Sequence, residues 1–203
     1  MNSNVEKLVR LMVEGAATQA ARAALLNNLS SDERKQANES LVFISFADAT
    51  RLISDPLKHS NENPERPDIR TSIDGLDYYF ELGEITDEAI PRGVAHSIKT
   101  KTVSGCAFSQ DDPLAKMLEQ KCAKRYETGG SPVDLLLYYW RQSPYEEIID
   151  EYLLRNSREI EERFQSSQFD KIWIYDCESR KVLWTKERKG GQVPLDPMQT
   201  SDG

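Results

Sequence analysis

Cysteine is scarce in this 203-residue chain and is poorly placed for a structural role. The three cysteines, Cys106, Cys122 and Cys177, are odd in number and widely spaced, and no two of them form a CxxC pair. This pattern does not match a disulfide framework, and it does not match a zinc site. Free thiols of this kind are typical of a reducing compartment, so we expect a cytoplasmic protein.

Long apolar runs and a surplus of positive charge are also missing. No segment approaches the length of a transmembrane helix and the first residues lack a signal-peptide pattern, so we expect no membrane partner. Lys and Arg number 26 against 34 Asp and Glu, which gives a net charge of −8. Because general nucleic-acid binders usually carry a basic surplus, any contact with nucleic acid must use a local patch.

The composition that remains is that of an ordinary globular protein, with 38% hydrophobic and 30% charged residues. We expect three parts: a helical segment over 1–58, an α/β core with a mixed sheet over 59–185, and a disordered tail over 186–203. The tail has few apolar residues and contains Gly-Gly and two prolines.

The N-terminal segment predicts two helices. The first covers about 4–28 and is rich in alanine; the second begins near Asp32, after Ser30, and reaches Ile53, with a break near Ser45. The alanine-rich stripe is either a face for homo-oligomerisation or, as is more common for such stripes, part of the core.

The stretch from Pro67 to Glu84 predicts a β-hairpin that turns at Asp74-Gly75, because Asp-Gly is a preferred pair for a type I′ turn. A two-residue turn fixes the register, so Ile73 faces Leu76 and Asp68 faces Glu81. Alternation then gives a core face and a polar face. We expect the core face to carry Ile69, Thr71, Ile73, Leu76, Tyr78, Phe80 and Leu82, and the polar face to carry Asp68, Arg70, Ser72, Asp77, Tyr79, Glu81 and Gly83.

The predicted register brings two carboxylates, those of Asp68 and Glu81, to opposite positions on neighbouring strands. Like charges at a separation of about 5 Å repel, so a positive charge should lie near them. Two sources fit. A divalent cation such as Mg²⁺ prefers carboxylate oxygens, and Arg70, a diagonal neighbour of Glu81, offers a guanidinium instead.

The rest of the chain predicts alternating helices and strands. We expect helices over about 86–98, from Pro113 to Gly129 and, as two pieces that meet near Asn156-Ser157, over 144–163. We expect strands over 133–140, 172–175 and 182–184. The nearly continuous apolar run at 133–140 is typical of a strand buried on both faces. A strand, a helix and a strand between 133 and 175 predict a parallel crossover.

One long irregular segment, 99–112, joins two of these helices. Loops of this length are often functional, and Lys99 and Lys101 give this one positive charge. Cys106 also lies here, and a small-molecule hydrolase that uses its thiol is a weak alternative. We expect no catalytic role for His96.

This order of elements resembles the PD-(D/E)XK nuclease superfamily, the restriction-endonuclease-like fold. The resemblance covers about residues 67–176. It rests on Pro67-Asp68 at a strand start, on Glu81-Leu82-Gly83 in the paired strand, and on the helix and buried strand that follow.

The resemblance implies a Mg²⁺- or Mn²⁺-dependent nuclease that hydrolyses DNA or RNA. Asp68 and Glu81 would hold the metal together with a backbone carbonyl near Leu82. The family usually has lysine where this chain has Gly83, and some members supply that lysine from the following helix. Lys121 is then the first substitute and Lys124 the second.

The same resemblance implies that Arg70, Lys99 and Lys101 contact phosphates of the substrate. The acidic net charge and Gly83 favour a second interpretation, in which the chain is an inactive nuclease-like fold that binds a protein partner or supports an assembly.

Overall fold

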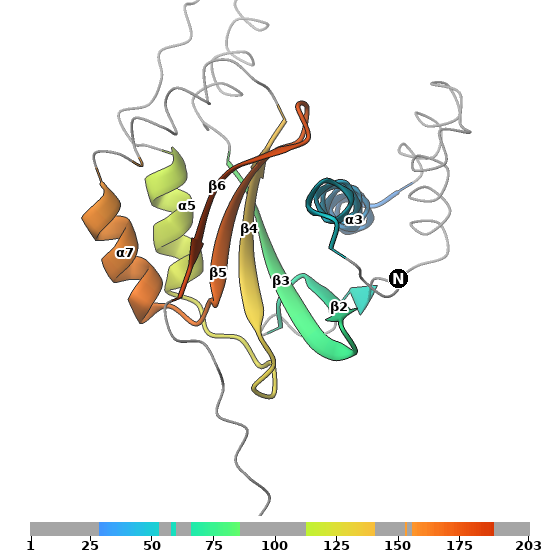
Figure 1. Ribbon diagram of the computed structural model, residues 1–203. Coiled ribbons are helices and arrows are strands. Elements are labelled where there is room, and N and C mark those ends of the chain that lie inside the picture. The colour runs from blue at the N-terminus through green and yellow to red at the C-terminus, as the bar shows by residue number, and fades with distance from the viewer. Residues whose placement is uncertain are drawn as a thin grey trace, which may run out of the picture.

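The structure, a computed structural model, describes residues 29–52, 58–59, 66–85, 113–140, 153 and 156–188. A mixed sheet lies between α3 on one side and α5 with α7 on the other (Figure 1). The elements are α3 (Ser31–Thr50), β1 (Lys58–His59), β2 (Ile69–Ile73), β3 (Leu76–Glu84), α5 (Pro113–Cys122), β4 (Val133–Tyr139), α7 (Ser157–Ser166), β5 (Lys171–Asp176) and β6 (Lys181–Glu187).

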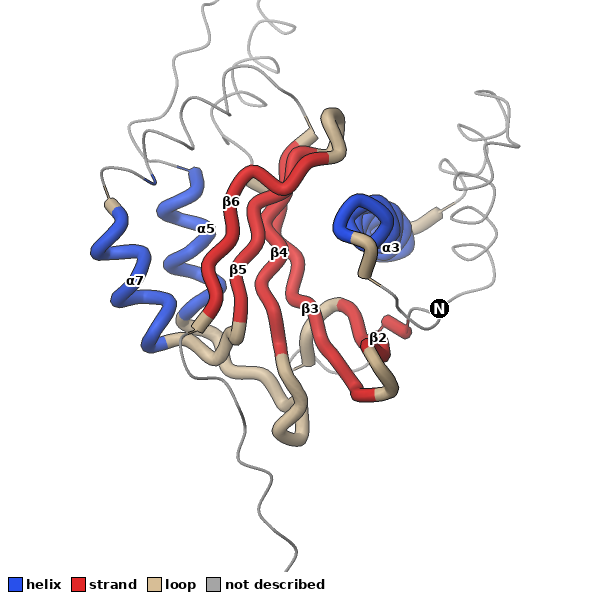
Figure 2. The backbone as a smooth tube through the Cα atoms, viewed as in Figure 1, coloured by secondary structure: helices blue, strands red, loops and turns tan. Residues whose placement is uncertain are grey.

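The six strands of the sheet lie in sequence order, β1 to β6 (Figure 2). The pairs β1–β2, β2–β3 and β5–β6 are antiparallel, whereas β3–β4 and β4–β5 are parallel. The predicted α/β class with a mixed sheet is confirmed. The parallel pairing of β4 and β5 agrees with the predicted crossover between them.

The hairpin of β2 and β3 has the predicted turn and register. Asp74 and Gly75 have φ values of 53° and 81°, as a type I′ turn requires. Ile73 pairs with Leu76, and the ladder continues to Ile69 opposite Phe80. The next residues outward from that pair are Asp68 and Glu81.

The prediction of one polar and one core face of this hairpin is wrong. Tyr79 and Glu81, assigned to the polar face, are 7% and 2% exposed, whereas Leu76, assigned to the core face, is 67% exposed. The physical reason is that helices cover both faces of β3 over its second half, while the hairpin tip extends beyond them.

Helix α3 covers one face of the sheet. It begins with a capping box, in which the Ser30 side chain accepts a hydrogen bond from the Glu33 backbone and the Glu33 carboxylate accepts one from the Ser30 backbone. It runs without the predicted break near Ser45. Its apolar face, with Phe43 and Phe46, packs in one cluster with Ile69, Phe80, Leu82, Leu136, Tyr138 and Tyr175.

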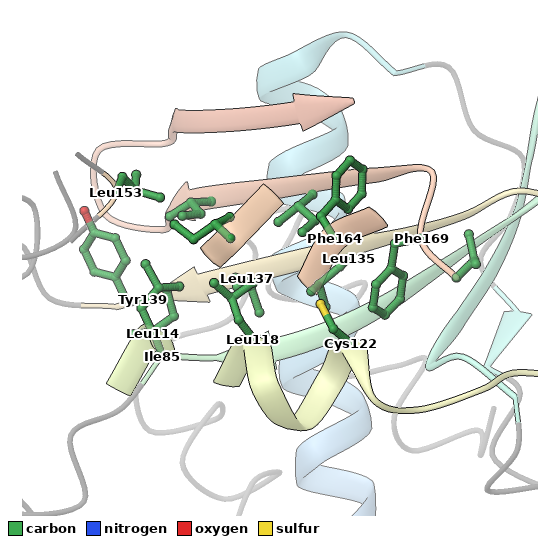
Figure 3. Packing of buried hydrophobic residues seen from close by; sticks show 14 of the residues in the cluster. Ile85, Leu114, Leu118, Cys122, Leu135, Leu137, Tyr139, Leu153, Phe164 and Phe169 are labelled. Atoms are coloured by element: carbon green, nitrogen blue, oxygen red, sulfur yellow. The ribbon is translucent and has the colours of Figure 1, made fainter. Parts of the chain in front are cut away.

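Helices α5 and α7 cover the opposite face. Leu114, Leu118 and Cys122 of α5 and Phe164 of α7 pack against Leu135 and Leu137 of β4 (Figure 3). Helix α5 does not reach Gly129 as predicted but ends at Cys122. The Gln168 side chain hydrogen-bonds both the backbone N–H and the carbonyl of Tyr126, so neither group is left for another helical turn.

Gly83 of β3 lies against Met117 of α5 and Leu137 of β4. A Cβ atom at this position would lie 2.9 Å from the Leu137 side chain and 3.0 Å from the Met117 sulfur. Real Cβ atoms essentially never show a contact below 3.0 Å, and a contact of 3.0 Å is tighter than nine in ten of theirs. The missing side chain therefore allows the helix to approach the strand.

Asp134 is a buried carboxyl group near the start of β4, 1% exposed. It accepts hydrogen bonds from the Tyr78 hydroxyl at 3.0 Å and the Trp173 indole at 2.8 Å. Burial is the main reason that its pKa rises to about 7.

The C-terminal strand is longer than predicted. β6 includes Lys186 and Glu187, which we assigned to a disordered tail. Of the two predicted helical pieces over 144–163, the structure describes Leu153 and α7, which begins at Ser157 as predicted. The predicted helices over 4–28 and 86–98, the segment 99–112 and the chain after residue 188 lie outside the described residues. Among the helices that are described, none has the length and apolarity needed to cross a membrane.

Candidate functional site

Asp68 lies immediately before β2. Its Oδ2 accepts a hydrogen bond of 2.8 Å from the backbone N–H of Leu82. This bond crosses the hairpin and fixes the carboxylate beside β3. On the other side, the ammonium of Lys35 from α3 lies 3.9 Å from Asp68 Oδ1. The side chain of Asp68 remains 16% exposed.

Glu81 lies in β3 and is almost completely buried, with 2% of its surface exposed. Two lysines supply positive charge to its Oε1. Lys121 Nζ is 2.5 Å away and Lys124 Nζ is 3.5 Å away. Since a buried carboxylate is costly without a partner, these lysines stabilise the ionised form.

Lys121 also reaches the main chain of β3. Its Nζ donates a second hydrogen bond, of 2.5 Å, to the carbonyl of Leu82. Lys121 lies in the last turn of α5, and its side chain is only 15% exposed. The close approach of α5 at Gly83 brings this lysine within reach of Glu81. Lys121 is thus placed beside Glu81, and its role as a substitute for the family's lysine stays a prediction.

The carboxyls of Asp68 and Glu81 have opposite pKa shifts. The pKa of Asp68 is raised, first by burial and second by the nearby Glu81 carboxylate. Burial also acts to raise the pKa of Glu81, but the favourable interactions of the carboxylate, led by the charge and hydrogen bond of Lys121, together outweigh it, so the pKa is lowered. At neutral pH we therefore infer an ionised Glu81 next to an Asp68 on which a negative charge is costly.

The structure adds a third carboxyl, Glu39 of α3, that the sequence analysis missed. It is 4% exposed, and Lys35 Nζ lies 3.4 Å from its Oε1. Burial and the charge of Asp68 raise the pKa of Glu39 to about 7. A signal existed: Glu39 shares the apolar stripe of Phe43 and Phe46 at spacings of four and seven, where a charged residue is unusual.

Tyr126 is the second residue that the sequence analysis missed. It is 7% exposed, and its ring packs 5.9 Å from that of Phe169. Burial raises the pKa of Tyr126, and the neighbouring Glu81 carboxylate raises it further. Its phenol therefore stays neutral beside Glu81. No sequence signal predicted that the Tyr126 phenol lies beside Glu81, since Tyr126 lies in an irregular segment after α5.

Arg70 is not the cation that neutralises the two carboxylates. Its guanidinium pairs with Asp77, at 3.1 Å from Nε and 2.5 Å from Nη2, across the hairpin. The charge beside Glu81 comes from lysines instead. Lys99 and Lys101, also predicted to contact a substrate, lie outside the described residues.

The oxygen donors gathered here are the Asp68 carboxylate, the Glu81 carboxylate and the Leu82 carbonyl. Mg²⁺ commonly uses one or two carboxylates and completes its shell with waters, so this donor set fits a hard divalent cation. Over the described parts of the chain, no three Asp, Glu, His or Cys side chains are grouped closely enough to hold a metal ion by themselves. A metal here would depend on the main-chain carbonyl and on solvent.

The comparisons with known proteins add no relative. The sequence matches no protein-family model and is significantly similar to no curated protein.

Proposed function

We propose that this protein is a metal-dependent nuclease of the PD-(D/E)XK type, with a restriction-endonuclease-like core. The observation that carries the proposal is the convergence of Asp68, Glu81, the Leu82 carbonyl and Lys121 at one end of a hairpin. Strand order supports it as well. A helix, a hairpin, a helix, a buried strand, a helix and a strand follow one another along the chain, and this is the order on which the resemblance rests.

The residues of the site have separate tasks in this proposal. Asp68 and Glu81 would hold Mg²⁺ or Mn²⁺ together with the Leu82 carbonyl. The bound metal would activate a water molecule and offset negative charge on the phosphate. The Leu82 N–H keeps the Asp68 carboxylate oriented, and the Lys121 ammonium orients the attacking water and donates to a phosphate oxygen.

Two exposed lysines flank the site and suit contacts with the nucleic-acid backbone. The side chains of Lys35 and Lys124 are 69% and 51% exposed, and they approach Asp68 and Glu81 respectively. These two lysines are the candidates for local positive charge in a chain of net charge −8, although each also pairs with a carboxylate of the site. Phosphate contacts position a nucleic acid without reading its sequence, so these lysines would not select a base sequence by themselves.

Thermal unfolding with and without millimolar Mg²⁺ or Mn²⁺ tests the metal. The native protein should unfold at a higher temperature when metal is added, because a ligand that binds only the folded state stabilises it. Asp68→Ala should remove that shift. The absence of any shift in the native protein would reject the metal site.

Cleavage of labelled single- and double-stranded DNA and RNA tests the activity. Glu81→Gln and Lys121→Met should each lower the rate by about a hundredfold or more, since each removes a charge at the reacting groups. Glu162→Gln changes an exposed carboxylate of α7, which is paired with Arg158, and should leave the rate unchanged.

A second function, as an inactive nuclease-like module that binds a protein partner, is favoured by one observation. Lys121 and Lys124 already neutralise Glu81, so the folded protein has no need of a metal. Under this alternative, neither Mg²⁺ nor Mn²⁺ shifts the unfolding temperature and none of the four nucleic acids is cleaved.

A further inference from the structure

Lys121 contacts two of the three oxygen groups that the proposed metal would use. Its Nζ lies 2.5 Å from Glu81 Oε1 and 2.5 Å from the Leu82 carbonyl oxygen. We propose that the Lys121 ammonium occupies the place of the metal cation in the metal-free protein. The ammonium leaves these oxygens when a divalent metal binds. This inference rests on the proposed function and concerns the same site.

The burial of Glu81 explains why the metal-free protein needs a positive charge at this place. A carboxylate that is 2% exposed is strongly destabilising without a positive partner, and breaking a buried pair from one side costs several kcal/mol in other proteins. The helix that approaches Gly83 supplies that partner from within the chain. The metal-free protein therefore folds with its site already neutralised.

Lys124 provides the contrast. It approaches the same oxygen of Glu81, but at 3.5 Å and with its side chain half exposed. The bond to the Leu82 carbonyl is made by Lys121, which is 15% exposed. Both residues carry the same charge and lie three positions apart, so they form a matched pair that separates the effect of position from that of charge.

Competition for shared oxygens has two consequences. The apparent metal affinity is the intrinsic affinity multiplied by the fraction of molecules in which Lys121 has left the site. The displaced ammonium also becomes available beside the site, where the phosphate of a substrate is expected. Metal binding would thus free the lysine that the hydrolysis step requires.

The competition is tested by calorimetric titration with Mn²⁺. The titrated proteins are the native chain, Lys121→Met, Lys121→Gln and Lys124→Met. Both Lys121 variants should bind Mn²⁺ about tenfold more tightly than the native protein, as removal of a competing state predicts. Lys124→Met should change the affinity by less than about threefold, because exposed charges interact weakly. Lys121 variants that bind no more tightly than Lys124→Met would overturn the inference and leave the proposed nuclease intact.

A second measurement uses the native chain and so needs no variant to fold. The rate at which an amine-reactive reagent modifies Lys121 is followed by mass spectrometry with and without Mg²⁺. Modification should become several-fold faster with Mg²⁺, while that of Lys124 changes little. An unchanged or slower rate at Lys121 in a protein that binds the metal contradicts displacement. If the native protein and all variants bind neither ion, the proposed function itself fails.

Discussion

The Oδ2 of Asp68 accepts a hydrogen bond of 2.8 Å from the backbone N–H of Leu82, the residue that follows Glu81. A single main-chain group thus holds one acidic side chain next to another. The arrangement has an energetic cost, because burial and the Glu81 charge both disfavour ionised Asp68. Costly charges held in place by specific bonds are typical of functional sites.

Asp68→Asn is expected to stabilise the metal-free protein at neutral pH by about 1 kcal/mol. The amide oxygen keeps the bond to Leu82, and the unfavourable charge disappears. Denaturant unfolding measures the change. The gain should vanish at acidic pH, where Asp68 is protonated in the folded native protein. Asp68→Ala, which loses the hydrogen bond as well, should be less stable than Asp68→Asn; equal stability of the two would show that the bond contributes nothing.

Gly83→Lys, which introduces the lysine that the proposed nuclease family usually has, should destabilise the protein by about 2 kcal/mol or more, since an added Cβ meets Leu137 and Met117. Gly83→Ala should cost less, because side-chain ends can move. Met117→Ala combined with Gly83→Ala should recover part of that cost in a double-mutant cycle. Strict additivity of the two changes would argue against direct contact.

The pKa of about 7 at Asp134 predicts how stability depends on pH. Since the folded pKa lies above the unfolded one, the folded state binds the extra proton between about pH 4 and pH 7. The contribution of Asp134 to the free energy of unfolding therefore falls as pH rises, by up to about 1.4 kcal/mol per pH unit.

Asp134→Asn should remove that contribution. The test compares the free energy of unfolding of the native protein and the variant across this pH range. The difference between them, rather than either curve alone, isolates Asp134, because Glu39 also has a raised pKa. Parallel curves for the two proteins would contradict the prediction.

Gly75→Ala should lower the free energy of unfolding by about 1 kcal/mol, because alanine is disfavoured at the φ of 81° found there. Apart from the neighbouring residues in sequence, no atom of the described part of the chain lies within 4 Å of an added Cβ, so the cost comes from the backbone. Asp74→Asn is the matched control in the same turn and should be nearly neutral, since asparagine tolerates a positive φ. Thermal or denaturant unfolding measures the stability of the two variants against that of the native protein.

The sequence was sufficient for the hairpin because its information is local. Asp74-Gly75 determines the turn type, the turn determines the register, and the register brings Asp68 next to Glu81. The apolar run of β4 was recognisable for a similar reason, since all seven of its residues are buried. Each of these features depends on neighbours in sequence.

The environment of the hairpin was not predictable in this way. Whether Tyr79 and Glu81 are exposed depends on where α5 lies, and nothing within the strand encodes that position. The early end of α5 likewise depends on Gln168, which lies more than forty residues beyond it. The contribution of α3 through Glu39 and Lys35 required the packing of a distant helix.

The missing side chain at Gly83 in the strand and the lysine at position 121 in the helix depend on each other. A bulky residue in the strand would hold α5 away, and a lysine on α5 could then no longer reach Glu81. Homologous chains should therefore vary at the two positions together. Those with a small residue in the strand should carry a cation in the last turn of the helix, and those with lysine in the strand should be free to lose it.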